Sequence, residues 1–212
     1  MSIHGLIISE HTMKYKIIIF DFDGTLVISK QIKIDTYFDI FQKYDVNVCK
    51  VREVLEQFPD LNRYDTIQKI VDLTGKKLDA ETLSSQYSVS VFDKIVAAKN
   101  LKFAKEVLEY LFTHNVKIHL SSNTPQHILS EIVYHRGWGK YFTSLNGFPL
   151  SKEETLKRIF DETKFAKNYY LVVGDGSSDK ISALSNNMDF FEIKTNSLLP
   201  LVKYLNIDIN QL

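Results

Sequence analysis

The most informative segment of the chain reads Ile17-Ile18-Ile19-Phe20-Asp21-Phe22-Asp23-Gly24-Thr25-Leu26. Its four leading residues form a continuous apolar run, which predicts a central strand buried on both faces. Asp21 and Asp23 follow at the carboxyl end of that strand, where open α/β sheets bind their ligands. Both side chains lie on the same side if the extended geometry continues, and two crowded carboxylates require a cation or a shared proton. The segment therefore predicts a metal site that combines a nucleophile with a proton-transfer group.

The spacing of apolar residues divides the rest of the chain into two kinds of sequence. Residues 29–98 contain one proline and one glycine, and their apolar residues recur at helical spacing, which predicts about four helices. From about Leu101 onward, helical and strand patterns alternate, which predicts a parallel sheet with helices on both faces. The expected strands after residues 17–20 are residues 116–120, 142–145, 169–173 and 189–193, and the expected helices between them are residues 125–135, 152–162 and 180–186.

Three further polar segments stand where predicted strands end or predicted helices begin. The sequence SSNTP at residues 121–125 follows the second strand, and GDGSSD at residues 174–179 follows the fourth strand. Between these two segments, Lys152 begins a predicted helix. Each of the three also has an ordinary structural explanation, so their order along the chain carries the functional argument.

The structural explanations are specific for each segment. SSNTP reads as a helix start capped by Asn123 or Thr124. Lys152 follows Ser151 in a sequence that forms a capping box with Glu154. GDGSSD reads as a loop between a strand and a helix. Four such segments in this order are much less frequent than any one of them alone, so their conjunction indicates a shared function.

Together the four segments resemble the motifs of the haloacid dehalogenase-like (HAD) phosphohydrolases, over a region from about Lys14 to the C-terminus. The resemblance implies a Rossmann-like α/β core with a central parallel sheet flanked by helices, formed by residues 13–28 and 99–212. The first strand is then central, with the second and fourth strands beside it, and all four motifs lie at one edge. Residues 29–98 resemble the small all-helical cap of the C1 type, and the implied branch is phosphoglycolate phosphatase-like.

The resemblance assigns chemistry to the two aspartates of the first segment. Asp21 resembles the nucleophile, whose carboxylate attacks a phosphoryl group and forms an aspartyl-phosphate. Asp23 resembles the general acid and base, which protonates the leaving alkoxide and later takes a proton from the attacking water. The dehalogenase branch lacks an acid at the position of Asp23, so this residue favours phosphoryl chemistry.

The same resemblance implies Mg²⁺ as the cofactor, a hard cation that takes a few carboxylate ligands and several waters at phosphate sites. Its implied ligands are the carboxylate of Asp21, the main-chain carbonyl of Asp23 and the carboxylate of Asp175. Asp179 is implied either as a direct ligand or as a neighbour of the ligands. The cation offsets the repulsion between Asp21 and an anionic substrate.

Three residues of the later motifs are candidates for binding the phosphoryl group. Ser122 resembles the residue that hydrogen-bonds a phosphoryl oxygen, with Ser121 as the alternative, and Asn123 is the neighbouring substrate-binding candidate. Lys152 resembles the residue that neutralises charge on Asp21 and on the transferring group. Phosphoryl transfer depends mostly on positioning and electrostatics, which these groups supply.

One residue of the helical segment is a further substrate-binding candidate. Arg63 stands in a loop before the third predicted helix, where an arginine can clamp the anionic or hydroxylated end of a substrate. The alternative is a surface arginine or an ion pair with Asp60 or Asp65. The sequence leaves both interpretations open.

The expected function is Mg²⁺-dependent hydrolysis of a small phosphomonoester through an aspartyl-phosphate. A phosphomutase that acts on a sugar phosphate is the first alternative, because it uses the same carboxylates and differs in how its cap retains the intermediate. A HAD-fold binding protein without catalytic activity is the second alternative. Each expectation has a small phosphorylated metabolite as the partner, and which metabolite this is stays open.

Composition bounds the remaining classes of function. The 26 basic and 26 acidic residues give a formal net charge of zero, which argues against a dedicated nucleic-acid-binding protein. No apolar run approaches the roughly 20 residues needed to span a membrane. Residues 1–12 lack a secretory pattern and are expected to be an extension outside the fold, and the single cysteine requires no oxidising compartment. We therefore expect a cytoplasmic protein, whose oligomeric state the sequence leaves open.

Overall fold

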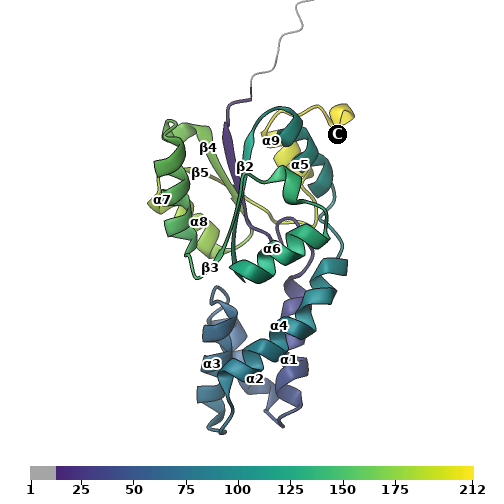
Figure 1. Ribbon diagram of the computed structural model, residues 1–212, viewed down its shortest axis with the longest axis vertical. Helices are drawn as coiled ribbons and strands as arrows, with labels where there is room; N and C mark the ends of the chain where they lie inside the picture. The colour runs from purple at the N-terminus through teal and green to yellow at the C-terminus, as the bar shows by residue number, and fades with distance from the viewer. Residues whose placement is uncertain (1–12) are drawn as a thin grey trace, which may run out of the picture.

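The structure is a computed structural model that describes residues 13–212 (Figure 1). Within these residues, five parallel strands form one sheet in the order β3-β2-β1-β4-β5. The strands are β1 (Ile17–Phe20), β2 (Lys117–Pro125), β3 (Ser144–Phe148), β4 (Tyr170–Gly174) and β5 (Asp189–Glu192). The predicted α/β class, the parallel sheet and the central position of the first strand are confirmed. The extension expected at residues 1–12 lies outside the described residues.

Strand β1 occupies the middle of the sheet because all four of its residues are apolar and fully buried. It pairs with β2 on one side and with β4 on the other. Successive side chains of a strand point to opposite faces. Accordingly, Ile18 and Phe20 belong to the larger hydrophobic cluster of the protein, whereas Ile17 and Ile19 belong to a smaller one. A continuous apolar strand is therefore what this two-faced position requires.

Helices cover both faces of the sheet (Figure 1). The larger hydrophobic cluster includes residues of α5 (Ala104–Thr113), α6 (Gln126–His135) and α9 (Leu199–Tyr204), and the smaller cluster includes residues of α7 (Lys152–Thr163) and α8 (Ser177–Ser185). Helices α5, α6 and α7 bury apolar residues three or four positions apart, which places them on one helical face. Nowhere in residues 13–212 is a helix both long and apolar enough to cross a membrane.

Four more helices form a separate layer beyond the carboxyl ends of the strands (Figure 1). They are α1 (Lys30–Gln42), α2 (Val48–Gln57), α3 (Arg63–Thr74) and α4 (Ala80–Ala97), which confirms the number expected for this segment of the described chain. Asp79 caps α4 by accepting a hydrogen bond from the main-chain N–H of Thr82, and Gly75 ends α3 with a φ of 66°. The chain enters and leaves this layer side by side, because Val27 forms a β-bridge with Asn100.

Strand β3 spans Ser144–Phe148 instead of residues 142–145, and two further element boundaries differ from the sequence-based expectation in ways that concern the carboxyl edge of the sheet. Strand β2 continues to Pro125, and α6 has no side-chain cap, so the interpretation of Asn123 or Thr124 as a helix cap is wrong. The Thr124 hydroxyl instead donates to the Asp23 carboxylate at 3.1 Å. Helix α8 begins at Ser177, earlier than expected, because the Asp179 carboxylate accepts a hydrogen bond from the main-chain N–H of Gly176. Both differences arise from residues of the carboxyl edge of the sheet.

His119 makes the stability of the fold dependent on pH. It lies on β2 with 2% of its surface exposed, its Nδ1 is 2.8 Å from the Ser144 hydroxyl, and its Nε2 has no hydrogen-bond partner. Burial, together with the positive charges of Lys117 and Arg158, lowers the pKa of His119 from 6.5 to about 4. As the pH falls from 6.5 towards 4, the unfolded state takes up a proton that the folded state does not, so folding stability is lost.

We expect the variant His119→Asn to remove this acid sensitivity while keeping a polar group beside Ser144. Between pH 7 and pH 4.5, the wild type should lose about 2 to 3 kcal/mol more stability than the variant. Urea unfolding at both pH values measures this difference, with exposed His127→Asn as the matched control. Equal pH dependence in the wild type and in His119→Asn would show that this histidine does not control acid stability.

Candidate active site

A cleft of about 450 Å³ lies between the carboxyl edge of the sheet and the layer of helices α1–α4. All eight candidate site residues predicted from the sequence line it: Asp21, Asp23, Arg63, Ser122, Asn123, Lys152, Asp175 and Asp179. They come from the carboxyl ends of β1, β2 and β4 and from the first residues of α3, α7 and α8. The parallel sheet brings most of them together, because its strands all end at this edge.

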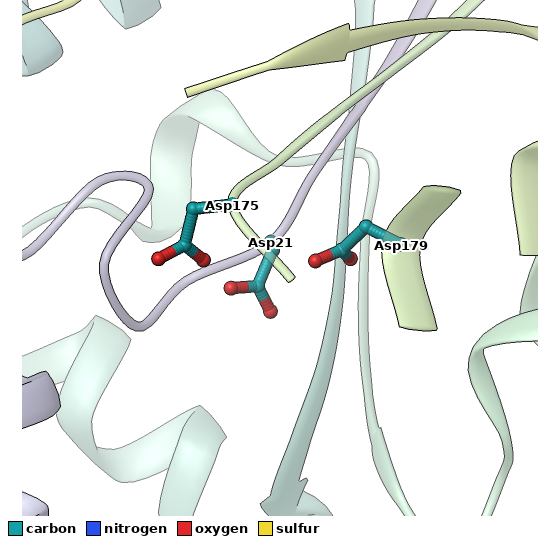
Figure 2. Close-up of side chains that lie close together, drawn as sticks. All are labelled: Asp21, Asp175 and Asp179. Carbon is teal, nitrogen blue, oxygen red and sulfur yellow. The ribbon is translucent and has the colours of Figure 1, made fainter. Parts of the chain in front are cut away.

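Three carboxylates meet at the sheet side of the cleft. Figure 2 shows the carboxylate of Asp21 between those of Asp175 and Asp179. One oxygen from each residue lies within 4.8 Å of the others. Asp21 and Asp179 are buried, so water cannot screen their mutual repulsion well. The arrangement fits a hard divalent cation, which prefers carboxylate oxygens and offsets this concentration of negative charge.

Lys152 offsets part of the charge within this cluster. Its ammonium is buried and contacts the Oδ1 atom of Asp21 at 2.8 Å and the Oδ1 atom of Asp179 at 2.6 Å. Burial alone lowers the pKa of Lys152, but the two carboxylates outweigh it and hold that pKa well above its usual range. Lys152 therefore stays charged, and its position at the start of α7 is fixed by the capping box of Ser151 and Glu154.

The Asp21 carboxyl is poised between its charged and neutral forms. Burial, with repulsion from Asp179 and Asp23, raises the pKa of Asp21 above its usual range, whereas Lys152 lowers it. A cation bound beside Asp21 and Asp175 would favour the charged form further. A cation in this cluster would therefore hold Asp21 as the carboxylate at neutral pH.

Two glycines bring the carboxylates close to the main chain. A Cβ atom on Gly174 would lie 2.3 Å from the Asp179 side chain, and one on Gly24 would lie 2.2 Å from an oxygen of Asp175. Gly24 also has a φ of 82°, which lets the chain turn sharply after Asp23. These positions leave no room for a larger side chain, because the carboxylates occupy it.

The sequence profile of the haloacid dehalogenase-like hydrolases matches residues 18–193, which include β1 to β5 and the helical layer between them. The chain belongs to this family. No curated protein is detectably similar in sequence. Solved structures, in contrast, include many with the same fold.

Three of these structures illustrate the similarity. The HAD-hydrolase YfnB from Bacillus subtilis, bound to magnesium, has 14% identity and a TM-score of 0.72, with 92% of this chain and 100% of that chain covered. A predicted phosphoglycolate phosphatase from Haemophilus somnus has 18% identity and a TM-score of 0.71, with 85% and 86% covered. A protein from Thermotoga maritima assigned as a beta-phosphoglucomutase has 16% identity and a TM-score of 0.66, with 89% and 90% covered. At these identities, the likeness concerns the fold.

In this HAD-like hydrolase, the Asp23 side chain faces the helical layer and stands apart from the three-carboxylate cluster. It accepts a hydrogen bond from Ser29 at 2.6 Å and from Thr124 at 3.1 Å, and it forms an ion pair with Lys33 of α1. Burial raises the pKa of Asp23, but Lys33 and these hydrogen bonds outweigh it and lower that pKa below its usual value. Asp23 is therefore held as a carboxylate, between the sheet and the helical layer.

The sequence analysis missed the two lysines of α1 that reach the cleft. Lys33 contacts Asp23, and Lys30 contacts Asp175 at 2.5 Å. Together with Ile34 and Tyr37, they line the cleft at intervals of three and four residues, which is the spacing of one helical face. That spacing is the available signal, but it does not single out the two lysines, because helical spacing also describes the residues that α1 buries.

Strand β2 contributes Ser122 rather than Ser121 to the cleft of this hydrolase. Ser122 lines the cleft and accepts a hydrogen bond from the main-chain N–H of Thr124 at 3.1 Å. Ser121 is buried, and its hydroxyl has no hydrogen-bond partner. The geometry therefore favours Ser122 over Ser121 as the residue that faces a ligand. Asn123, also in the cleft, donates its amide to the main-chain carbonyl of Asp60 at 3.0 Å.

The loop between α2 and α3 closes one side of the cleft. Its residue Asp60 accepts hydrogen bonds from Asn123 and from Ser177, which lie on the sheet side. Beside it, the rings of Tyr64 and Phe148 lie 5.6 Å apart between the two layers. The helical layer of this HAD-like hydrolase thus contacts the sheet edge at points that surround the carboxylates.

Arg63 is the first residue of α3 and lies inside the cleft with 5% of its surface exposed. Neither Asp60 nor Asp65 forms an ion pair with this arginine; Asp60 accepts a hydrogen bond from Ser177, and Asp65 accepts one from Asn62. The alternative interpretation, a surface arginine or an ion pair with Asp60 or Asp65, is therefore wrong. The burial of Arg63 could not be predicted, because it depends on how α3 packs against α4.

Proposed function

We propose that the protein is a Mg²⁺-dependent phosphatase that hydrolyses a small phosphomonoester through an aspartyl-phosphate on Asp21. The observation that carries this proposal is the position of the Asp21 carboxylate, which lies at the end of the central strand, beside Lys152 and Asp175, and opens into a cleft of about 450 Å³. A carboxylate supported in this way is an effective nucleophile towards phosphorus once its negative charge is offset.

The residues that would hold Mg²⁺ are Asp21, Asp175 and the main-chain carbonyl of Asp23. Asp179 is the fourth candidate, although Lys152 and the main-chain N–H of Gly176 already bind its two oxygens. When bound, the cation offsets the repulsion between Asp21 and the anionic phosphoryl group. The acidic cluster supports this assignment, as does the magnesium bound by the Bacillus subtilis protein of the same fold.

Asp21 and Asp23 divide the chemistry between them. A carboxylate oxygen of Asp21 attacks phosphorus, and the bond from phosphorus to the leaving oxygen breaks. The Asp23 carboxyl gives that oxygen its proton, so Asp23 must be protonated for this step, although Lys33 favours its carboxylate form in the ligand-free cleft. Asp23, now a carboxylate, takes a proton from water as the water oxygen attacks phosphorus. Inorganic phosphate leaves, and Asp21 is regenerated. The contact with Lys33 favours the carboxylate form of Asp23, which is the form required in the second half of the reaction.

The remaining residues of the site bind the phosphoryl oxygens. Ser122 and Asn123 would donate hydrogen bonds from the end of β2, and Lys152 would neutralise negative charge on Asp21 and on the transferring phosphoryl group. The distance of 2.8 Å between the Nζ atom of Lys152 and the carboxylate of Asp21 supports this role. Such preorganised donors stabilise the transition state without having to reorient during the reaction.

We assign residues 29–98 to a C1-type cap and residues 13–28 and 99–212 to the catalytic core. The paired connections at Val27 and Asn100 support this division, since both crossings lie at one hinge. The phosphoglycolate phosphatase-like branch is supported by the fold shared with the Haemophilus somnus protein. The contacts of Asp60 with Asn123 and Ser177 hold the cap against the core, and the cap would have to release them to open the cleft to a substrate.

Phosphate release from a panel of small phosphomonoesters tests the proposal. We expect phosphate release in the presence of Mg²⁺. The rate of release should fall by a factor on the order of 100 or more in EDTA, because a main electrostatic contribution to catalysis is lost, and it should recover when Mg²⁺ is restored. Release that is insensitive to EDTA would contradict the metal assignment. Isomerisation of a sugar phosphate without phosphate release would identify a phosphomutase instead.

A further inference from the structure

Two cationic side chains are buried in the cleft, and their surroundings differ. Lys152 contacts two carboxylates, those of Asp21 and Asp179. Arg63 is equally buried, but no carboxylate of residues 13–212 forms an ion pair with it. One of these buried charges is therefore compensated within the protein, and the other is not.

The contacts of Arg63 hold its guanidinium in place without neutralising it. Nη1 donates to the Ser88 hydroxyl at 2.5 Å, and the guanidinium carbon lies 5.0 Å from the centre of the Tyr87 ring. Both partners are on α4. The other guanidinium nitrogens have no hydrogen-bond partner among residues 13–212, and they are not sealed from the cleft that Arg63 lines. The guanidinium is thus held by the hydrogen bond to Ser88 and by the ring of Tyr87, and its other N–H donors remain available to a ligand.

A guanidinium in this position requires an anion. It cannot lose its proton, and a buried charge without a partner is costly. The contact with an aromatic ring recovers only part of that cost. A carboxylate or phosphate matches the remaining donors of an arginine in geometry and charge. Since the described part of the protein supplies no such group to Arg63, a ligand in the cleft is the remaining source.

The position of Arg63 separates this charge from the phosphoryl site. The rings of Tyr37 and Tyr87 pack at a tilt of 32° with their centres 4.3 Å apart, and both line the cleft. Burial raises the pKa of both phenols, and each also responds to the positive charge of Arg63 and to the negative charge of Asp23. Tyr87 lies against the Arg63 guanidinium, and both rings line the cleft that Asp23 also lines. A molecule whose phosphoryl group is at Asp21 would extend along these rings towards Arg63.

We propose that Arg63 binds a second anionic oxygen group, a carboxylate or a phosphate, on the leaving group of the substrate. The inference rests on the proposed function, because it takes the phosphoryl group to be at Asp21. Between the two anionic groups, the scaffold of the substrate packs against apolar side chains of the cap, such as Leu55 and Phe58. The substrate class is then a small phosphomonoester that carries a second negative charge at its far end.

Binding of non-hydrolysable probes tests this inference without requiring turnover. The probes are alkyl phosphonates of two to five carbons that end in a carboxylate, a second phosphonate or a hydroxyl group, titrated calorimetrically in Mg²⁺. We expect the wild type to bind an anionic probe about 30-fold or more tightly than the hydroxyl probe of the same length. Comparing the affinities of the carboxylate and phosphonate probes shows which of these two anionic groups Arg63 prefers. Equal affinity for anionic and hydroxyl probes at every length would overturn the inference.

The variant Arg63→Met should bind all probes with the affinity of the hydroxyl series, and Arg63→Lys should recover part of the preference. Arg52→Met, an exposed arginine of the same cap, is the matched control and should keep the wild-type preference. Without ligand, Arg63→Met should melt at the wild-type temperature or above it, because it removes an uncompensated buried charge. A lower melting temperature together with an unchanged probe preference would show that Arg63 is only structural.

Turnover of matched phosphomonoesters separates the two proposals. Hydrolysis with no preference for anionic substrates would overturn the role of Arg63 and leave the phosphatase assignment intact. Tight, Arg63-dependent binding of anionic probes without any hydrolysis would support the subsite and contradict the phosphatase assignment.

Discussion

The variant Asp21→Asn should release phosphate at a rate lower than the wild type by a factor on the order of 10⁴ or more. The amide cannot form the acyl phosphate, so both halves of the reaction are lost together. Asn has nearly the size of Asp, and the variant keeps Lys152 paired with Asp179 at 2.6 Å, so we expect it to stay folded. Steady-state phosphate release at saturating Mg²⁺ measures the effect.

Three observations make this test decisive for the nucleophile. Asp161→Asn, on the exposed side of α7, is the matched control and should retain wild-type activity. The wild type, quenched in acid during turnover, should carry one phosphoryl group that Asp21→Asn lacks, which mass spectrometry of the intact chain detects. A rate within tenfold of the wild type in Asp21→Asn would exclude Asp21 as the nucleophile.

The part of the site that comes from strand ends could be predicted from the sequence. Asp21, Ser122 and Asp175 each follow an apolar run, and a parallel sheet places all such positions on one edge, whatever the rest of the chain does. The capping box of Ser151 and Glu154 predicts where α7 begins, whereas the place of Lys152 in the site was implied by the resemblance to the family's motifs. These residues depend on local patterns and on one rule of sheet topology.

The part of the site that comes from packing between the two layers could not be predicted. Ser29 and Lys33 reach Asp23 only because α1 folds back over the carboxyl edge, and no local pattern fixes that angle. Thr124 was interpreted as a helix cap, which is its usual role, but β2 continues past it and its hydroxyl turns to Asp23 instead. The burial of Arg63 likewise depends on contacts with α4. Sequence periodicity does not identify such partners, because they lie far apart along the chain.

The variant Lys152→Met should reduce both activity and stability. Without the ammonium, the carboxylates of Asp21 and Asp179 stay buried with no cation beside them, which should lower the free energy of unfolding by about 3 to 5 kcal/mol when no metal is present. Burial already raises the pKa of each carboxyl, and the loss of Lys152 raises both further above their values in the unfolded chain. Stability is therefore lost as the pH rises, and the destabilisation should be larger at pH 8 than at pH 5.

Mg²⁺ separates the structural and catalytic contributions of Lys152. A cation bound at Asp21 and Asp175 compensates part of the negative charge that lost its partner when Lys152 was replaced. Mg²⁺ should therefore stabilise Lys152→Met more than it stabilises the wild type. Turnover should stay low even in saturating Mg²⁺, because the phosphoryl group still lacks the ammonium beside Asp21. Denaturant unfolding with and without Mg²⁺, at both pH values, measures the first effect, with exposed Lys157→Met on the same helix as the control. If Mg²⁺ restored full activity to Lys152→Met, the lysine would serve only to balance charge in the metal-free protein, and its role in binding the phosphoryl group would be wrong.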